Sequence, residues 1–283
     1  MLVYLPALSA ALIWAYCVII YRQISIRSNV ISVNIWRLVS STLFLFILSL
    51  LFTGFNLSIG LVYASLSGMI TLGIGDTLYF YSCVMAGASV ATPIVFTYII
   101  FIQLTASLFG EPLTLNKIIA SIMAFIGISI LSRKKEGEGV NRFKGVILAV
   151  ISMFVWVIGQ TALKPAVIYS DPIDVTFIRS LTGLITLTLI YSGTAVKHIN
   201  MMRTDKYKLL VLGVLDIGIG AYLYILSISL LGLSITVILT SLMPLFTQIL
   251  AIITKTEKVT IIEVLSAILI ILAIILCLSL IHI

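Results

Sequence analysis

One segment of this chain occurs twice, and this internal repeat constrains the fold more than any other feature. Residues 68–103 align with residues 213–248 at an offset of 145, and most matched pairs are Gly, Ser, Tyr or Gln. Because the chain is rich in Leu and Ile, chance matches would be mostly Leu and Ile. The aligned segments therefore indicate two copies of one half-protein unit.

The repeat extends toward both ends of the chain. The further aligned pairs are Trp14 with Trp156, Arg37 with Arg179, and Glu111 with Glu257. The offset grows from 142 to 146 along the chain, so the second copy carries extra residues, which fall in predicted loops where insertions are tolerated. We expect one repeat at residues 1–135 and the other at residues 142–283.

The composition predicts a multi-pass protein of the cell membrane. The chain is 61% hydrophobic and 10% charged, whereas a soluble globular domain is about 45–50% apolar and about 25% charged. The longest polar segment, residues 132–141, is too short for an aqueous domain. The first apolar run lacks a basic start and a small-residue cleavage site, so we expect a span there rather than a signal peptide. The net charge of +7 lies in short loops, which argues against nucleic-acid binding.

Ten runs are long and apolar enough to be spanning helices, which need about 20 residues. They are residues 3–21, 35–53, 60–82, 88–109, 115–132, 144–163, 174–193, 208–230, 233–254 and 260–281. Each half supplies five, and very short connections between some runs force antiparallel neighbours. We therefore expect an all-α fold of ten transmembrane helices in two five-helix repeats.

Five spans per repeat is an odd number, so the second repeat must enter the membrane the opposite way up. Equivalent loops of the two halves carry opposite Lys and Arg bias, as an inverted-topology repeat requires. On this topology 13 of the 17 Lys and Arg lie on one side of the membrane. The bias alone places both termini outside the cell.

The chain resembles the EamA-type transporters of the drug/metabolite transporter superfamily. The resemblance rests on the five-plus-five duplication, the Trp late in each first span, the Arg opening each second span, and the Gly-Tyr-Ser pattern of the third spans. A Glu-x-x-Thr string between the fourth and fifth spans adds to it, at Glu111–Thr114 and Glu257–Thr260. The family implies secondary transport, often export, of small organic solutes such as amino acids through a central cavity between the halves.

The chain departs from the family in two respects. Family members usually carry a Pro in the fourth span of each copy. Pro244 fits this pattern, but the equivalent first-half position is Ile99, and Pro93 lies six residues earlier. Members are also often drawn with both termini in the cytoplasm, which is opposite to the charge bias. The geometry of the first-half gate and the orientation therefore stay open.

Asp76 and Asp216 are the two acidic residues deep in the predicted bilayer. A charged Asp at the centre of a span costs about 2.5–3.5 kcal/mol on insertion scales, so it should face a partner or water. Each lies beside a Gly-x-Gly, which lets helices approach closely or unwind. One interpretation is a site for a proton or a substrate amine; the other is a buried carboxyl hydrogen-bonded between helices. Asp216 lies closer to the start of its span, which favours the structural role there.

Arg37 and Arg179 begin the second and seventh predicted spans. They would pair an anionic group of the substrate or an internal carboxylate, or they would extend to the membrane interface, as arginines at helix ends often do. Inverted symmetry would place them on opposite membrane faces. The functional version of this prediction is two gates, one on each face.

Other polar and aromatic side chains in the spans would form the cavity wall, or would bond neighbouring helices together. They are Trp14, Trp156, Tyr79, Tyr224, Tyr98, Gln103, Gln248 and Gln160. The pairs related by the repeat are favoured for substrate binding, because two-fold symmetry would direct both members to one centre. We read Glu111 and its Thr114 as local helix caps.

The alternative function is an intramembrane aspartyl protease. Residues 73–76 match the Gly-x-Gly-Asp string of those enzymes, and Asp216 would be the partner that shares a proton with Asp76. The partner of those families usually precedes the string, whereas Asp216 follows it. The repeat explains the Gly-x-Gly without a protease, so we expect no enzyme, and we also expect no cofactor and no metal.

The sequence thus predicts a transporter that works by alternating access, with bending at Pro93, Pro244 and the Gly-x-Gly segments. Its partners would be a small-molecule substrate and the lipid bilayer, with protons as the candidate coupling ion and Asp76 as the first candidate to carry them. A monomer or a homodimer is compatible with the sequence. The substrate and the direction of transport are not encoded in any motif.

Overall fold

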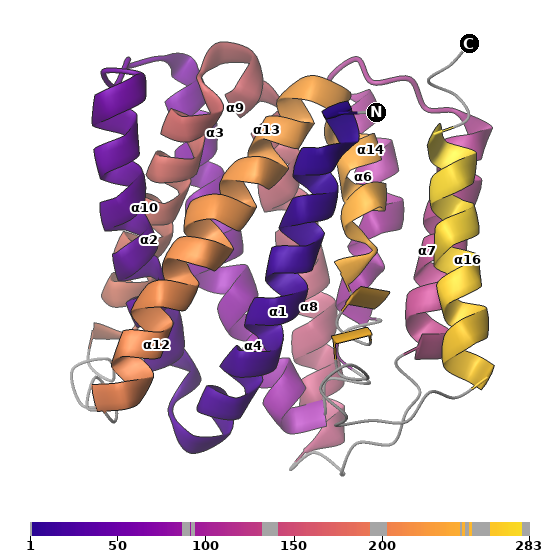
Figure 1. Cartoon of the computed structure of the whole chain (residues 1–283), viewed down its shortest axis with the longest axis horizontal. Coiled ribbons are helices and arrows are strands. Elements are labelled where there is room, and N and C mark those ends of the chain that lie inside the picture. The colour runs from indigo at the N-terminus through magenta and orange to yellow at the C-terminus, as the bar shows by residue number, and fades with distance from the viewer. Residues whose placement is uncertain are drawn as a thin grey trace.

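The computed structural model describes residues 2–86, 91, 94–131, 141–192, 203–243, 245–246, 249–250 and 261–278. Every regular element in these ranges is a helix, which agrees with the all-α prediction (Figure 1). The predictions at Pro93, Pro244 and Gln248 lie outside the described residues.

The described helices of the first half coincide with its predicted spans. They are η1 (Leu2–Tyr4), α1 (Leu5–Arg27), α2 (Val30–Phe52), α3 (Ile59–Ser67), η2 (Gly68–Gly75), α4 (Asp76–Ala86), α6 (Tyr98–Ser107) and α7 (Leu115–Leu131). The segments α3, η2 and α4 form one continuous helix, in which η2 is π-helical. A π-helical turn inside an α-helix often marks a functional site.

The second half has a matching series of helices. They are α8 (Arg142–Thr161), α9 (Leu163–Tyr169), α10 (Pro172–Ile190), α12 (Arg203–Gly213), η3 (Val214–Gly220), α13 (Ala221–Leu231), α14 (Leu233–Thr240) and α16 (Ile261–Leu278). The π-helical segment η3 joins α12 to α13, as η2 joins α3 to α4.

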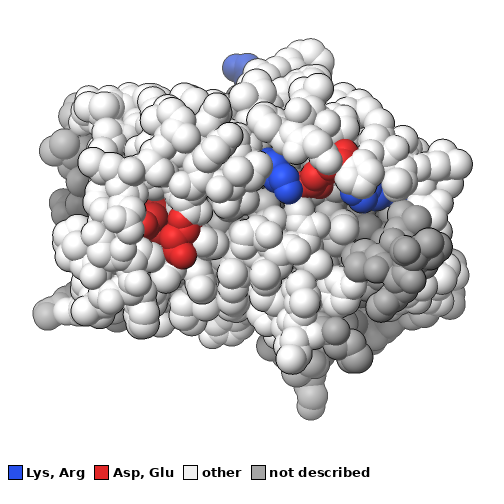
Figure 2. All heavy atoms as spheres, turned by 90° about the horizontal axis from the view of Figure 1, so that it is seen from above, with Lys and Arg blue, Asp and Glu red and all other residues white. Residues whose placement is uncertain are grey.

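Six helices of the described residues are long and apolar enough to cross a membrane. They are Leu2–Tyr21, Val30–Phe52, Ile59–Ala86, Phe143–Tyr169, Pro172–Ile190 and Asp205–Leu231. Large apolar side chains cover their outer surface; Leu51 and Phe52, for example, are each 72% exposed. This apolar outer surface suits a lipid environment. Figure 2 looks onto the end of the molecule that is uppermost in Figure 1, and few Lys, Arg, Asp or Glu side chains are visible there among the described residues.

The helices α2 and α10 begin earlier than predicted, because each has a capping side chain. The Asn29 side chain accepts a hydrogen bond from the backbone N–H of Ile31, and Asp171 accepts one from Ile173, both at 2.8 Å. The predicted starts at residues 35 and 174 were therefore too late. Arg37 and Arg179 lie about two turns inside their helices rather than at the ends.

The two halves are interleaved rather than side by side. The η2 segment packs on α8 and α10 of the second half, and η3 packs on α1 and α2 of the first. A Cβ atom added at Gly68 would lie 2.1 Å from the backbone oxygen of Arg179, and one at Gly213 would lie 2.3 Å from that of Arg37. Sequence-equivalent glycines therefore make equivalent close contacts, with the roles of the halves exchanged.

The Gly-x-Gly segments also bring the tryptophans close to the helix backbone. A Cβ atom added at Gly75 would lie 2.5 Å from Cδ1 of Trp156, and one at Gly220 would lie 2.9 Å from Nε1 of Trp14. Only glycine leaves room for an indole at these distances. The close approach expected from the Gly-x-Gly pattern is present at both copies.

Side-chain hydroxyls join α2 to α10 along their contact. The Ser180 hydroxyl lies 2.9 Å from that of Ser41 and 2.8 Å from that of Thr42. Nearer the helix ends, Ser49 and Thr53 each donate a hydrogen bond of 2.5 Å to the Asp174 carboxylate. Such inter-helix hydrogen bonds between small polar residues hold membrane helices together. They fix the helix pair that carries the two arginines.

Candidate functional site

Arg37 holds both of the aspartates predicted to lie in the membrane. Its Nη1 donates a hydrogen bond of 3.1 Å to Oδ2 of Asp216, and its Nη2 donates to Oδ2 of Asp76. All three side chains are largely buried, and buried charges persist in a folded protein when they are paired. Asp76 opens α4 and Asp216 lies in η3, so one guanidinium joins segments from both halves.

Two aromatic rings complete the surroundings of Arg37. Its Cζ lies 5.6 Å from the ring centroid of Tyr21 and 5.2 Å from that of Phe80, which are cation–π distances. Sequence reasoning selected neither ring, because an aromatic residue in an apolar span carries no signal of a charged neighbour. Their repeat equivalents, Leu163 and Ile225, are not aromatic.

Asp216 lies deeper in its helix than the sequence indicated. The described helix begins at Arg203 rather than near residue 208, so Asp216 is more than three turns from that end. It is still nearer to the start than to the end of the candidate span Asp205–Leu231, as predicted. It shares its ion-pair partner, Arg37, with Asp76.

Arg179 has a different set of partners. Its Nε donates to the Ser67 hydroxyl at 3.1 Å, and its Nη2 donates to the Thr71 hydroxyl at 3.0 Å. Like Arg37, it is only 4% exposed, so neither arginine extends to the membrane interface. Within the described part of the chain, no carboxylate lies within ion-pair distance of Arg179.

The predicted aromatic residues form two groups related by the repeat. Trp14 contacts Tyr224, with ring centroids 5.3 Å apart, and its Nε1 donates to the backbone oxygen of Asp216 at 3.2 Å. Trp156 contacts Tyr79 at 5.5 Å and Tyr98 at 5.4 Å. Each tryptophan therefore pairs with the tyrosine of the opposite half.

These groups surround one cavity of about 120 Å³ in the helix bundle. Of the predicted site residues, it is lined by Trp14, Arg37, Asp76, Tyr79, Tyr98, Trp156, Gln160, Arg179, Asp216 and Tyr224. Both arginines reach this one cavity, so the expectation that they lie apart on opposite faces is not met. Tyr21, Phe80 and Phe96 also line it and were not predicted.

Gln103 does not reach the cavity. Its Nε2 donates to the backbone oxygen of Ile99 at 3.2 Å and to that of Ser234 at 3.4 Å, which joins α6 to α14. The side chain is 2% exposed. It therefore has the helix-bonding role that was the structural alternative for the predicted glutamines.

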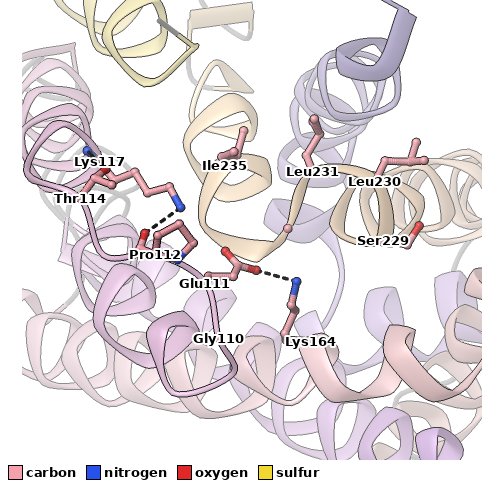
Figure 3. Close-up of a pocket in the computed structure, with 11 residues that line it drawn as sticks. Gly110, Glu111, Pro112, Thr114, Lys117, Lys164, Ser229, Leu230, Leu231 and Ile235 are labelled. Carbon is pink, nitrogen blue, oxygen red and sulfur yellow. Dashed lines mark hydrogen bonds and ion pairs between the residues drawn. The ribbon is translucent and has the colours of Figure 1, made fainter. Parts of the chain in front are cut away.

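A second cavity, of about 450 Å³, lies where the loop after α6 meets the start of α14 (Figure 3). Glu111 accepts hydrogen bonds from the backbone N–H groups of Leu233 at 2.6 Å and Ser234 at 2.9 Å, and its Oε1 lies 3.0 Å from Nζ of Lys164. Glu111 thus caps a helix 122 residues away rather than a neighbouring one. Thr114 has the predicted local role, since it accepts a bond of 3.4 Å from the Lys117 N–H.

Glu111 lies between helices, outside the spans, and is ionised in the folded protein. Burial alone would raise the pKa of its carboxyl group, but hydrogen bonds from Ser234, Leu233 and Lys164 outweigh burial and lower the pKa below its ordinary value of 4.5. The folded-state pKa is below the unfolded-state pKa. The carboxylate therefore contributes stability that is complete above the ordinary value and is lost as the pH falls through the folded-state value.

Glu111→Gln is expected to lower the free energy of unfolding at pH 7 by about 1.5–3 kcal/mol, the range for a hydrogen bond to a charged group. The difference between the variant and the wild type should shrink when the pH is lowered below the ordinary Glu value of 4.5. Thermal unfolding in detergent at the two pH values measures it. An equal difference at both pH values would show that the charge of Glu111 has no part in the cap.

The fold and the cavity define a multi-pass membrane protein with a polar, buried site among apolar helices. A model of the EamA-like transporter family matches residues 1–133 and 143–279. The chain therefore belongs to the EamA-like transporter family, within the drug/metabolite transporter superfamily.

Two further proteins are similar to this chain. An uncharacterized transporter of Archaeoglobus fulgidus is 30% identical over 193 residues, which are 66% of this chain and 68% of the relative. A solved crystal structure of another protein has the same fold, with a TM-score of 0.82, 15% identity, and coverage of 98% of this chain and 96% of the other.

The protease alternative receives no support from the EamA-like family model or from the Archaeoglobus fulgidus relative, which is an uncharacterized transporter. The geometry also disfavours it. An aspartyl protease needs two carboxyl groups that share a proton around one water, whereas Asp76 and Asp216 both bind the guanidinium of Arg37.

Proposed function

We propose that this protein is a secondary-active or facilitative transporter, and specifically an exporter, of small organic metabolites such as amino acids. The ten predicted spans would form two five-helix inverted repeats, with boundaries at residues 1–135 and 142–283. Each half would supply helices to the central cavity, which would open to one membrane face at a time. Membership of the EamA-like family supports transport in general, and the cavity supports this mechanism in particular.

The observation that carries the proposal is the buried Arg37 cluster at the contact of the two halves. Asp216 lies within the π-helical segment η3, and α4, which begins at Asp76, follows the π-helical segment η2; helices kink at such π-helical turns. The Arg37–Asp216 pair joins the two halves, whereas the Arg37–Asp76 pair lies within the first half. A proton that binds Asp216 in competition with Arg37 would remove this link and would therefore favour a second arrangement of the halves.

Uptake into proteoliposomes tests the proposal. A mixed pool of metabolites is offered with and without a pH gradient, and the internal solutes are identified by mass spectrometry. Accumulation above that in empty liposomes would establish transport, and dependence on the gradient would establish proton coupling. Correctly folded protein that takes up nothing from a broad pool would contradict the proposal.

Asp76→Asn is expected to preserve folding and to abolish flux driven by a pH gradient. The amide keeps a hydrogen-bond acceptor for Arg37, and Asp216 still neutralises the guanidinium, but the amide cannot take up a proton. Asp171→Asn is the matched control, because Asp171 is an exposed N-cap and Asn caps equally well. Unchanged coupled flux in Asp76→Asn would remove Asp76 from the mechanism.

A further inference from the structure

The two arginines of the cavity are equivalent in the sequence repeat but differ in charge compensation. At the offset of 145, the pairs of equivalent positions are Asp216 with Thr71, Asp76 with Ala221, and Leu212 with Ser67. Both carboxylates that bind Arg37 are thus replaced by uncharged residues at the positions equivalent for Arg179. The Arg179 site therefore has the arginine of the Arg37 site but lacks its two acidic residues.

The bonds to the arginines follow this substitution pattern. The Nη1 of Arg37 bonds Asp216 at 3.1 Å, and the Nη2 of Arg179 bonds the equivalent Thr71 at 3.0 Å. The Nε of Arg179 bonds Ser67, whereas the Nε of Arg37 has no partner among the described residues. Hydroxyls therefore hold the Arg179 guanidinium in the equivalent place, but they leave it without a carboxylate at ion-pair distance among the described residues.

A buried guanidinium without a directly bonded carboxylate is costly. Arginine stays protonated in proteins, and moving a charge out of water costs several kcal/mol unless it is paired. Arg179 is 4% exposed and lines the cavity of about 120 Å³. Its Nη1 makes no hydrogen bond to the described part of the chain, so this nitrogen of the guanidinium is free to donate to a ligand.

Two further polar atoms of the cavity wall lack partners within the described ranges. They are the Tyr224 hydroxyl and Oε1 of Gln160, in side chains that are 1% and 8% exposed. Buried polar atoms normally have a hydrogen-bond partner. Their presence beside Arg179 in one cavity indicates a site whose polar contacts are completed by a solute.

We propose that Arg179 is the anion subsite of the cavity and binds a carboxylate of the transported solute through its guanidinium. Gln160 and Tyr224 would bond the rest of the solute, and Arg37, whose guanidinium already bonds two aspartates, would not take part in anion binding. That the bound solute is transported rests on the proposed function, whereas the existence of the anion-binding site does not. An inorganic oxyanion such as phosphate offers the same chemistry, and the experiment separates the two sources.

Binding is measured on the detergent-solubilised full chain, by tryptophan fluorescence and thermal shift. The probes are α-amino acids, other small carboxylic acids, the primary amide of each, inorganic phosphate and sulfate. The variants are Arg179→Gln, which removes the charge, and Thr71→Asp, which restores the acid found at the equivalent position 216. Thr71→Asn matches the latter without a charge, and Lys144→Gln removes an exposed cation far along α8 from the cavity residues.

The wild type is expected to bind a carboxylate at least about tenfold more tightly than the corresponding primary amide. This ratio corresponds to the free energy of one charge-assisted hydrogen bond, which the amide cannot make. Arg179→Gln and Thr71→Asp should both abolish this preference, while Lys144→Gln keeps it. Thr71→Asn changes the same side chain without adding a charge and should therefore retain more of the preference than Thr71→Asp. If Arg179→Gln does not fold, Thr71→Asp still decides. Phosphate binding with the same dependence would identify an inorganic anion as the occupant.

The inference is overturned if no anion in the panel binds, or if carboxylates are preferred equally with and without the Arg179 charge. Flux into proteoliposomes is measured separately with the same compounds. Arg179-dependent binding without any flux would sustain the anion subsite and contradict the transporter proposal. Flux that is the same for a carboxylate and for its amide would support the transporter proposal and contradict the anion subsite.

Discussion

Arg37→Met is expected to lower the free energy of unfolding by about 3–5 kcal/mol, the usual cost of removing one partner from a buried ion pair. Methionine leaves Asp76 and Asp216 buried in an apolar bundle without the guanidinium that both carboxylates bond. It also removes the link between α2 of the first half and η3 of the second. The yield of monodisperse protein in mild detergent and its thermal unfolding temperature measure the loss.

The triple variant Arg37→Met, Asp76→Asn, Asp216→Asn separates charge from packing. It removes all three charges of the cluster, so no unpaired charge is left buried, and it should recover a large part of the lost stability. A single variant as stable as the wild type would mean that the aspartates find other partners. A triple variant as unstable as the single one would assign the loss to packing.

Gly68→Ala is also expected to lower the free energy of unfolding. The added Cβ atom would lie 2.1 Å from the backbone oxygen of Arg179 and 2.3 Å from Oγ1 of Thr182, so η2 and α10 would have to move apart. Overpacking of this kind costs about 1–3 kcal/mol and occasionally more. The shift would also separate Thr71 from Arg179, so any Arg179-dependent anion binding should weaken with the stability.

Leu66→Ala is the control for this variant, because Leu66 lies two residues away on the same helix and is 44% exposed. It changes a side chain on the outer surface without changing the helix contact. We expect it to unfold within a few degrees of the wild type. Gly68→Ala behaving like Leu66→Ala would contradict the close packing of η2 on α10.

The helical fold could be predicted because apolar runs and the internal repeat are properties of the sequence alone. The cavity positions of Trp14 and Trp156 could also be predicted, since two aligned tryptophans in apolar spans indicate a shared centre. The helix starts were less accessible. Asn29 and Asp171 cap their helices, and short polar residues before an apolar run do not reveal how far the helix extends.

Contacts between distant residues could not be predicted. Nothing in the sequence near Asp216 shows that it shares Arg37 with Asp76, because the bond joins residues 179 positions apart. The remote cap at Glu111 was missed for the same reason, since Glu-x-x-Thr reads as a local motif. Gln103 showed the opposite error, because a repeated polar residue was taken for a cavity residue when its bonds join two helices.

The interleaving of the halves has a consequence for biosynthesis. Ser67 and Thr71 are made more than 100 residues before Arg179, so the first half enters the membrane with its binding surface for α10 still empty. Asp76, by contrast, has its partner in its own half, because Arg37 precedes it on the nascent chain and can neutralise it as soon as both are made. The buried charge of Asp76 is therefore synthesised together with its counterion Arg37, and the second half assembles onto a first half in which this charge is already neutralised.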